Sequence, residues 1–286
     1  MSSRQNTKLD GIRDIFVALT EEGHGDEAYS SITYGLALAE VAGAHLTVQA
    51  ASKRIVAVGA LFPSVTRALI ASENQRVSAL AQVVAERAAT GASMAGVVCT
   101  TETLSLSYPD LLARVAWQAR LHDLTILDAE ARAIDVDREL IEAVLFASGR
   151  PVLVVPPSTA SLTVRRLMIA WDGSAPAARA VSDALPFLRA AEEVEVVSVV
   201  GEKEFPTSAV GSEIAPHLSR HGVTVTVTEL PLQGTAFETL HGHVLATRAD
   251  MLVMGAFRHS RLRDWFFGGV TQSFLKRTPV PLFLAH

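Results

Sequence analysis

The sequence predicts an α/β protein made of two repeats, each a doubly wound parallel sheet of five strands, related by a pseudo-twofold axis. Short apolar runs alternate with longer stretches in which apolar residues recur every three or four positions, as in parallel strands joined by helices. The order of these elements restarts after the Pro-Pro-Ser-Thr segment at 156–159. The sequence therefore predicts two domains, 1–158 and 159–286.

Strands in the first repeat are expected where short apolar runs are bounded by polar or turn residues. They lie at 12–19, 44–51, 94–101, 123–127 and 152–155. Helices are expected at 28–41, 63–89, 109–120 and 138–147, the third of them opening with Pro109 at a tolerated first-turn position.

The second repeat follows the same order. Strands are expected at 167–171, 194–200, 223–230, 251–254 and 280–284. Helices are expected after 172–174 with an end near Arg189, at 213–221, at 235–247, and as a short segment after Gly268-Gly269.

The two repeats can be aligned by counting residues. Thr20 aligns with Asp172 at an offset of 152, Asp123 with Asp250 at 127, and Pro151 with Pro279 at 128. The smaller later offsets predict that the first repeat carries a longer αβ stretch before its fourth strand.

Composition restricts the class of protein. A length of 286 residues suits two domains, and a formal net charge of −5 argues against a broad nucleic-acid surface. Cys99 is the only cysteine, which excludes an internal disulfide; we expect it as a small buried side chain in a strand. The polar N-terminus does not resemble a signal peptide, and no apolar stretch is long enough to span a bilayer, so a cytoplasmic protein without a membrane partner is expected.

An anion site is predicted near the end of the second repeat. An apolar strand ends at Gly255, an arginine-rich loop follows, and Gly268-Gly269 opens a helix. Free N–H groups and the positive end of the helix dipole favour an anion at such a turn. Asp172 also follows a strand, so it is expected on the same rim, where parallel sheets bind ligands.

These residues resemble the tandem universal stress proteins, over nearly the whole chain. The segment IAWDGS at 169–174 is similar to the family's first strand, and 250–271 is similar to its ATP loop. Nucleotide-binding members have Gly, two residues, Gly, nine residues, Gly, and then Ser or Thr. Gly255 and Gly268 match this spacing, whereas Arg258 and Gly269 depart from it.

The resemblance implies the fold of the adenine-nucleotide alpha-hydrolase-like proteins and a site for ATP or another adenine nucleotide, with or without Mg²⁺. It also implies that the last strands of the two repeats, 152–155 and 280–284, meet at the junction between them. The resemblance, together with the suitability of arginine for phosphate, predicts one set of nucleotide contacts, with Asp172 on the adenosine part: Asp172, Gly255, Arg258, His259, Arg261, Gly268, Gly269, Val270 and Thr271.

Each of these roles has a structural alternative. Asp172 could be a helix N-cap, although Ser174 could fill that role instead. The glycines could mark tight turns, and the arginines could be solvated loop residues. Thr271 could cap the last helix rather than reach a phosphate.

The first repeat departs further from the family pattern. Thr20 stands at the position of Asp172 and Asp128 at that of Gly255, and no glycine-rich loop follows. A carboxylate repels a phosphate, so we interpret this repeat as degenerate and without a nucleotide.

The leading hypothesis is a stress-response binding or sensor module with one adenine nucleotide per chain, an intramolecular pseudo-dimer that could also form a homodimer. A second hypothesis is a protein-interaction or other small-ligand module that has lost ATP binding. A nucleotide-processing enzyme is a weaker third, because the sequence contains no P-loop, G-x-S-x-G or HExxH motif, and slow ATP hydrolysis is the most that is expected. The pairs His217/His221 and His241/His243 lack a zinc-type partner, so no metal site is predicted.

Overall fold

The computed structural model describes residues 9–21, 29–56, 63–129, 136–157, 159, 161–201, 211–256 and 269–286, without the side chains of 63–66 and 136–137. Four predicted site residues, Arg258, His259, Arg261 and Gly268, therefore lie outside the described residues.

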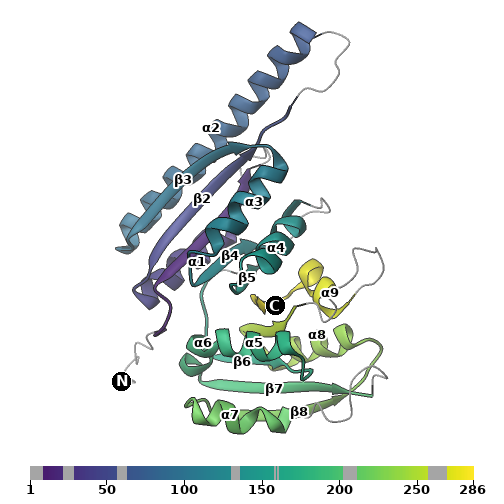
Figure 1. Cartoon of the computed structure of the whole chain (residues 1–286). Coiled ribbons are helices and arrows are strands. Elements are labelled where there is room, and N and C mark those ends of the chain that lie inside the picture. The colour runs from purple at the N-terminus through teal and green to yellow at the C-terminus, as the bar shows by residue number, and fades with distance from the viewer. Residues whose placement is uncertain are drawn as a thin grey trace.

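A single sheet of ten strands runs through the molecule in the order β3-β2-β1-β4-β5-β10-β9-β6-β7-β8 (Figure 1). The strands of the first half are β1 (Asp14–Glu21), β2 (His45–Lys53), β3 (Cys99–Leu106), β4 (Leu124–Asp128) and β5 (Val152–Val155). Those of the second half are β6 (Arg166–Ala170), β7 (Glu193–Val200), β8 (Val225–Pro231), β9 (Met251–Gly255) and β10 (Leu282–Ala285).

The α/β class and the parallel order within each half confirm the prediction, but the two predicted sheets are joined into one. Strands β5 and β10 pair antiparallel, with Leu282 opposite Val154 and Leu284 opposite Val152. The last strands of the two halves therefore meet at the junction, as expected.

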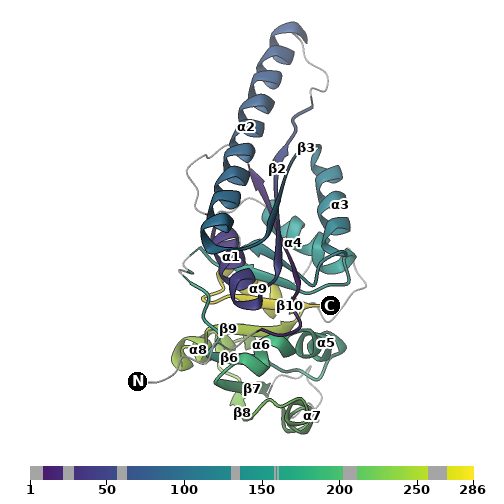
Figure 2. The same cartoon turned by 90° about the vertical axis from the view of Figure 1, so that its left-hand side faces the viewer.

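Helices cover both faces of the sheet (Figures 1 and 2). One buried cluster contains residues of α1 (Ser30–Ala42), α5 (Ala175–Asp183), α6 (Leu185–Ala190) and α7 (Ala215–Arg220). The other contains residues of α3 (Tyr108–Ala119), α4 (Val136–Ala147), α8 (Ala236–Thr247) and α9 (Val270–Arg277). Each cluster includes residues of both halves, so the two cores are continuous across the junction.

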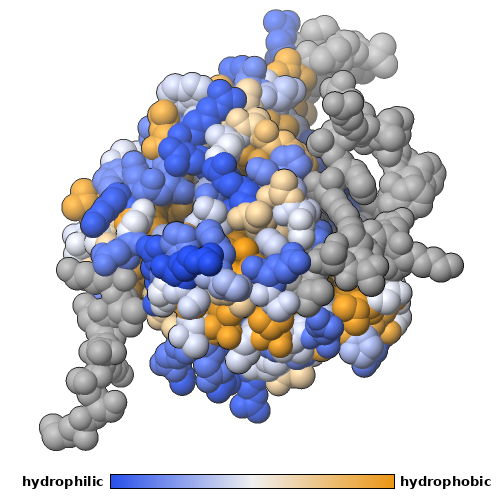
Figure 3. All heavy atoms as spheres, turned by 60° about the horizontal axis from the view of Figure 1, so that its bottom comes forward, coloured by the Kyte–Doolittle hydropathy of each residue, from blue (hydrophilic) through white to orange (hydrophobic). Residues whose placement is uncertain are grey.

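The extra αβ stretch of the first half is α2 (Pro63–Ala95), a helix of 33 residues that projects beyond the body of the molecule (Figure 1). The corresponding part of the second half contains the single turn η1 (Gly211–Glu213) and the short α7. Figure 3 shows the lower end of the molecule, where hydrophilic and hydrophobic side chains are interspersed. None of the helices in the described ranges is long and apolar enough to cross a membrane.

The strand register tests the alignment of the repeats. Ile15 pairs with Leu124 as Leu167 pairs with Met251, which confirms the offsets of 152 and 127. The offset of 128 for the last strand is wrong.

The equivalent of Pro151 is Pro281, 130 residues later, because Thr125 N donates to Pro151 O as Leu252 N donates to Pro281 O. Two prolines flank Val280, and the sequence alone does not tell which of them precedes the strand.

Three local expectations are also corrected. The third strand begins at Cys99 rather than at 94, because α2 continues to Ala95 and ends at Gly96, whose φ of +67° stops the helix. The helix expected to end near Arg189 is two helices that meet at Ala184. Cys99 lies on an edge strand and is partly exposed rather than buried.

Candidate functional site

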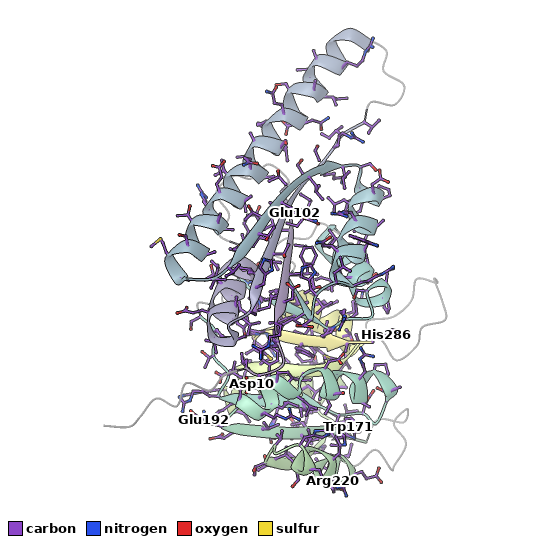
Figure 4. The ribbon with its side chains drawn as sticks, turned by 60° about the vertical axis from the view of Figure 1, so that its left-hand side comes forward. Asp10, Glu102, Trp171, Glu192, Arg220 and His286 are labelled. Carbon is purple, nitrogen blue, oxygen red and sulfur yellow. The ribbon has the colours of Figure 1, made fainter. Side chains whose placement is uncertain are left out.

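The candidate site lies at the carboxyl ends of β6 and β9, where Ala170 is the register partner of Met254. The chain leaves β6 toward β7 and leaves β9 toward β10, in opposite directions, so this is the topological switch point at which α/β sheets bind ligands. Figure 4 shows Trp171 and His286, which follow β6 and β10, on the same side of the second half.

At the Asp172 turn, the residue that caps α5 differs from the residue that is predicted to bind the ligand. Ser174 is the N-cap of α5, and its Oγ accepts a hydrogen bond of 3.2 Å from the backbone N of Ala177. Asp172 is half-buried, and its Oδ1 accepts a 3.0 Å bond from the backbone N of Ser174. The turn thus uses one carboxylate oxygen of Asp172, and the helix takes its cap from Ser174.

Gly255 is required by packing. A Cβ at this position would lie 2.4 Å from Ala177 N and 2.6 Å from Pro176 C. Both are backbone atoms in the first turn of α5, so they cannot move aside as a flexible side chain could. The glycine therefore lets the end of β9 contact the start of α5, and this contact holds Gly255 beside the Asp172 turn whether or not a ligand binds.

Gly269 is the N-cap of α9 and, unlike Gly255, is not required by packing. Its φ of −66° is open to any residue, and a Cβ would have no atom within 4 Å among the described residues. No side chain of the described residues caps this helix, whose first turn contains Val270 and Thr271. Thr271 is 6% exposed and takes part in other contacts, which favours its structural role.

The described part of the predicted site is therefore split between two faces of the sheet. Asp172 and Gly255 are held together through α5, whereas Gly269, Val270 and Thr271 open α9 on the opposite face, where Phe274 packs on Phe237 with ring centroids 4.9 Å apart. Residues 257–268, which carry the predicted arginines, connect them in sequence and lie outside the described residues.

The equivalent rim of the first half is built differently. Asp128, at the position of Gly255, accepts hydrogen bonds from the backbone N and the Oγ of Ser31 in the first turn of α1. The Oγ1 of Thr20, at the position of Asp172, is buried without a hydrogen-bond partner among the described residues. At this rim the carboxylate of Asp128 is therefore already hydrogen-bonded to the start of α1.

Sequence reasoning missed a second repeated feature, at the amino ends of the strands. Asp123 Oδ2 accepts hydrogen bonds from the backbone N of Arg13 and Asp14, and Asp250 Oδ2 accepts them from Arg165 and Arg166. The signal was present in the aligned Asp-apolar pairs. These two carboxylates fix strand starts and lie at the wrong end of the sheet for the predicted ligand.

The histidine pairs of the second half have other partners. His243 Nε2 lies 3.1 Å from both oxygens of Glu195, and His221 is bonded to Arg189. Within the part of the chain that the structure describes, no group of three or more His, Cys, Asp or Glu residues is arranged to hold a metal ion.

Comparison with known proteins supports the fold. Residues 163–286 match the model of the Universal stress protein family. A universal stress protein of Archaeoglobus fulgidus DSM 4304 has a similar structure, with a TM-score of 0.69 and 15% identity over 95% of this chain and 97% of that one.

A protein of Pseudomonas aeruginosa UCBPP-PA14, assigned to the universal stress proteins, gives a TM-score of 0.56 and 18% identity over 97% of this chain and 94% of that one. At these identities the likeness shows the fold. No curated protein matches the sequence.

Proposed function

We propose that the second half binds ATP or another adenine nucleotide at the carboxyl ends of β6 and β9, and that the protein acts as a stress-linked binding module rather than a fast enzyme. The observation that carries the proposal is that Ser174, and not Asp172, caps the helix that follows the Asp172 turn. Because Ser174 caps α5 and the turn uses only Oδ1 of the half-buried Asp172, the other carboxylate oxygen is available for a ligand. The family match at 163–286 also covers every proposed contact residue.

The chemistry of the rim fits the two ends of a nucleotide. A carboxylate accepts hydrogen bonds from ribose hydroxyls or an amino group, and charge-assisted bonds of this kind are the strong ones. The first turn of α9 offers backbone N–H groups and the positive end of a helix dipole, and Gly269 places no side chain over them. Phosphates would lie at this helix end, and Mg²⁺ would arrive bound to them.

One nucleotide per chain is expected. The carboxylate of Asp128 stands at the Gly255 position of the first half and would repel a phosphate, and Thr20 replaces Asp172 there. The first half then contributes the continuous sheet and the long α2 rather than a second site.

The test is to denature the purified protein, look for released nucleotide by chromatography, and titrate the nucleotide-free protein with ATP by calorimetry. We expect one site per chain. Asp172→Ala removes one or two charge-assisted bonds of about 1.5–3 kcal/mol each, so affinity should fall at least roughly tenfold.

Ser174→Ala is the matched control. It removes the N-cap bond and should cost about 1 kcal/mol of folding free energy, with an ATP affinity close to that of the wild type. If wild-type protein releases no nucleotide and gives no heat with millimolar ATP, the proposal is wrong. The alternative of a module for a different ligand or a protein partner then stands.

A further inference from the structure

A cavity lies at the amino-terminal end of the strands of the second half, between the amino ends of β6 and β7 and the end of α8. Its volume is 250 Å³, and the residues that matter for its chemistry are Arg166, Met168, Glu193, Glu195 and Ala249. Pockets for drug-sized ligands measure roughly 300–1,000 Å³. This cavity therefore suits a small group.

The internal repeat shows what occupies the same place in the first half. Asp123 N donates to Asp14 O as Asp250 N donates to Arg166 O. Because His122 precedes Asp123 and Ala249 precedes Asp250, these two residues occupy equivalent positions. An imidazole in the first half thus corresponds to a methyl group in the second.

The His122 side chain is buried, at 4% exposure. It stacks on Phe16 with centroids 5.0 Å apart and an interplanar angle of 22°. Its Nδ1 donates a 2.9 Å hydrogen bond to Gln118 O, and its Nε2 lies 3.7 Å from Asp14 Oδ1. A flat ring with nitrogen donors, held against a carboxylate, is therefore the occupant that this architecture accepts.

In the second half the surrounding strand positions are kept, but Ala249 supplies no ring at the place of His122. The register that pairs Phe16 with Thr47 pairs Met168 with Glu195, so a thioether replaces the stacking ring and a carboxylate replaces a hydroxyl. Met168 is 1% exposed, so it closes the base of the cavity, and the groups that a ligand can reach are the polar side chains of β7 around it.

The charge of the cavity favours a cation. Glu193 and Arg166 form an ion pair of 3.1 Å at the exposed mouth, with side chains 66% and 46% exposed. Glu195 lies deeper, at 22% exposure, and accepts hydrogen bonds from His243 Nε2 and from Thr228 Oγ1. A carboxylate has about four lone-pair sites, and His243 Nε2 contacts both oxygens of Glu195 while Thr228 Oγ1 contacts one, so capacity for about one further donor remains.

We propose that this cavity binds a flat nitrogen cation of the imidazolium or guanidinium class, placed beside Ala249 and hydrogen-bonded to Glu195. The cation is carried either by a small molecule or by the side chain of a protein partner. The site is independent of the nucleotide rim, which lies at the other end of the same strands.

The probe is N-methylguanidinium, with neutral N-methylurea of the same shape as the matched control ligand. Binding to the full chain is followed by the NMR signals of the Met168 methyl group and of neighbouring backbone amides. We expect saturable shifts with methylguanidinium at millimolar concentration and none with methylurea. Equal or unsaturable shifts with both ligands would overturn the proposal.

Two variants test the place of binding. Ala249→His should fill the cavity from within, as His122 does, and abolish the shifts, whereas Ala178→His on the exposed surface of α5 should leave them unchanged. Glu195→Gln should weaken binding by about tenfold or more, because it removes the charge that strengthens the hydrogen bond. Retained affinity in both cavity variants would contradict the assignment.

The first half supplies a reciprocal variant. His122→Ala should open a matching cavity, and imidazole should then raise the melting temperature of this variant but not that of Ala249→His.

To separate the two sources of the cation, a short peptide with one central arginine is compared with methylguanidinium. Tighter binding of the peptide indicates a protein partner, and equal binding indicates a small molecule.

Discussion

The carboxylate of Asp128 accepts two hydrogen bonds from Ser31, one from the backbone N at 2.8 Å and one from the hydroxyl at 2.5 Å. Ser31 is fully buried in the first turn of α1, and Tyr29 at the N-cap position supplies no side-chain cap. A strand from a distant part of the chain therefore caps the helix. In the second half the cap of α5 is local, from Ser174, and β9 ends in a glycine at the same place.

Asp128→Ala should destabilise the protein, because it leaves the buried hydroxyl and N–H of Ser31 without this acceptor. Bonds to a charged group contribute about 1.5–3 kcal/mol each, so the loss of two of them should lower the free energy of unfolding by roughly 3–6 kcal/mol. Urea unfolding measures it, with Glu139→Ala on the exposed face of α4 as the control. A loss equal to that of the control would show that the capping bonds do not hold α1.

The two glycines of the candidate site should respond differently to alanine. Gly255→Ala forces a Cβ to within 2.4 Å of a backbone N, so β9 and α5 must separate, and a loss of several kcal/mol, about the size of a severe core mutation, is expected. Gly269→Ala meets open space and should cost at most about 1 kcal/mol through the weaker N-cap. Thermal and urea unfolding of both variants provide the measurement.

This pair also separates packing from binding. If Gly269→Ala remains folded but binds ATP less tightly, the backbone of the α9 start is part of the nucleotide site. Gly269→Ser restores the residue type of the family pattern and supplies a helix cap, so it should raise stability by a few tenths of a kcal/mol, about the usual difference between these caps. A Gly255→Ala variant as stable as Gly269→Ala would refute the close contact with α5.

Phe283→Ala should weaken both halves at once. Phe283 is 1% exposed on β10, pairs with Leu153 of β5, and packs edge-on against Phe187 with centroids 5.7 Å apart. Removing a buried phenyl ring costs about 3–5 kcal/mol. Because the cluster continues across the junction, fluorescence and far-ultraviolet circular dichroism should report one coincident transition at lower urea concentration. Two separated transitions would show that the halves unfold independently.

The period of the apolar residues carried most of the fold prediction. Buried parallel strands such as Val152–Val155 read as short apolar runs, and the repeated order fixed the two halves and the strands at their junction. The start of the last strand was predicted wrongly because neighbouring residues offered equivalent alternatives. Pro279 and Pro281 look alike in sequence, and only the hydrogen bond of Leu252 N to Pro281 O shows which one starts the strand.

The candidate site was predictable only in part, because its residues depend on distant backbone. The sequence placed Asp172 and Gly255 on one rim, and the register confirms that their strands end together. It could not show that Gly255 is dictated by the first turn of α5, or that Asp128 caps α1 from another strand. The His122 and Ala249 difference was equally hidden, since it has meaning only once the strands are in register.

The thiol of Cys99 gives a prediction that needs no other variant, since it is the only cysteine. Partial burial on the edge strand β3 raises its pKa, because a thiolate loses hydration there. Alkylation by iodoacetamide, followed by mass spectrometry, should be slower at pH 7.5 than that of an unfolded control in urea. Its pH profile should have a midpoint above the ordinary thiol value of about 8.5. A midpoint below that value would mean that a nearby positive charge outweighs the burial of the side chain.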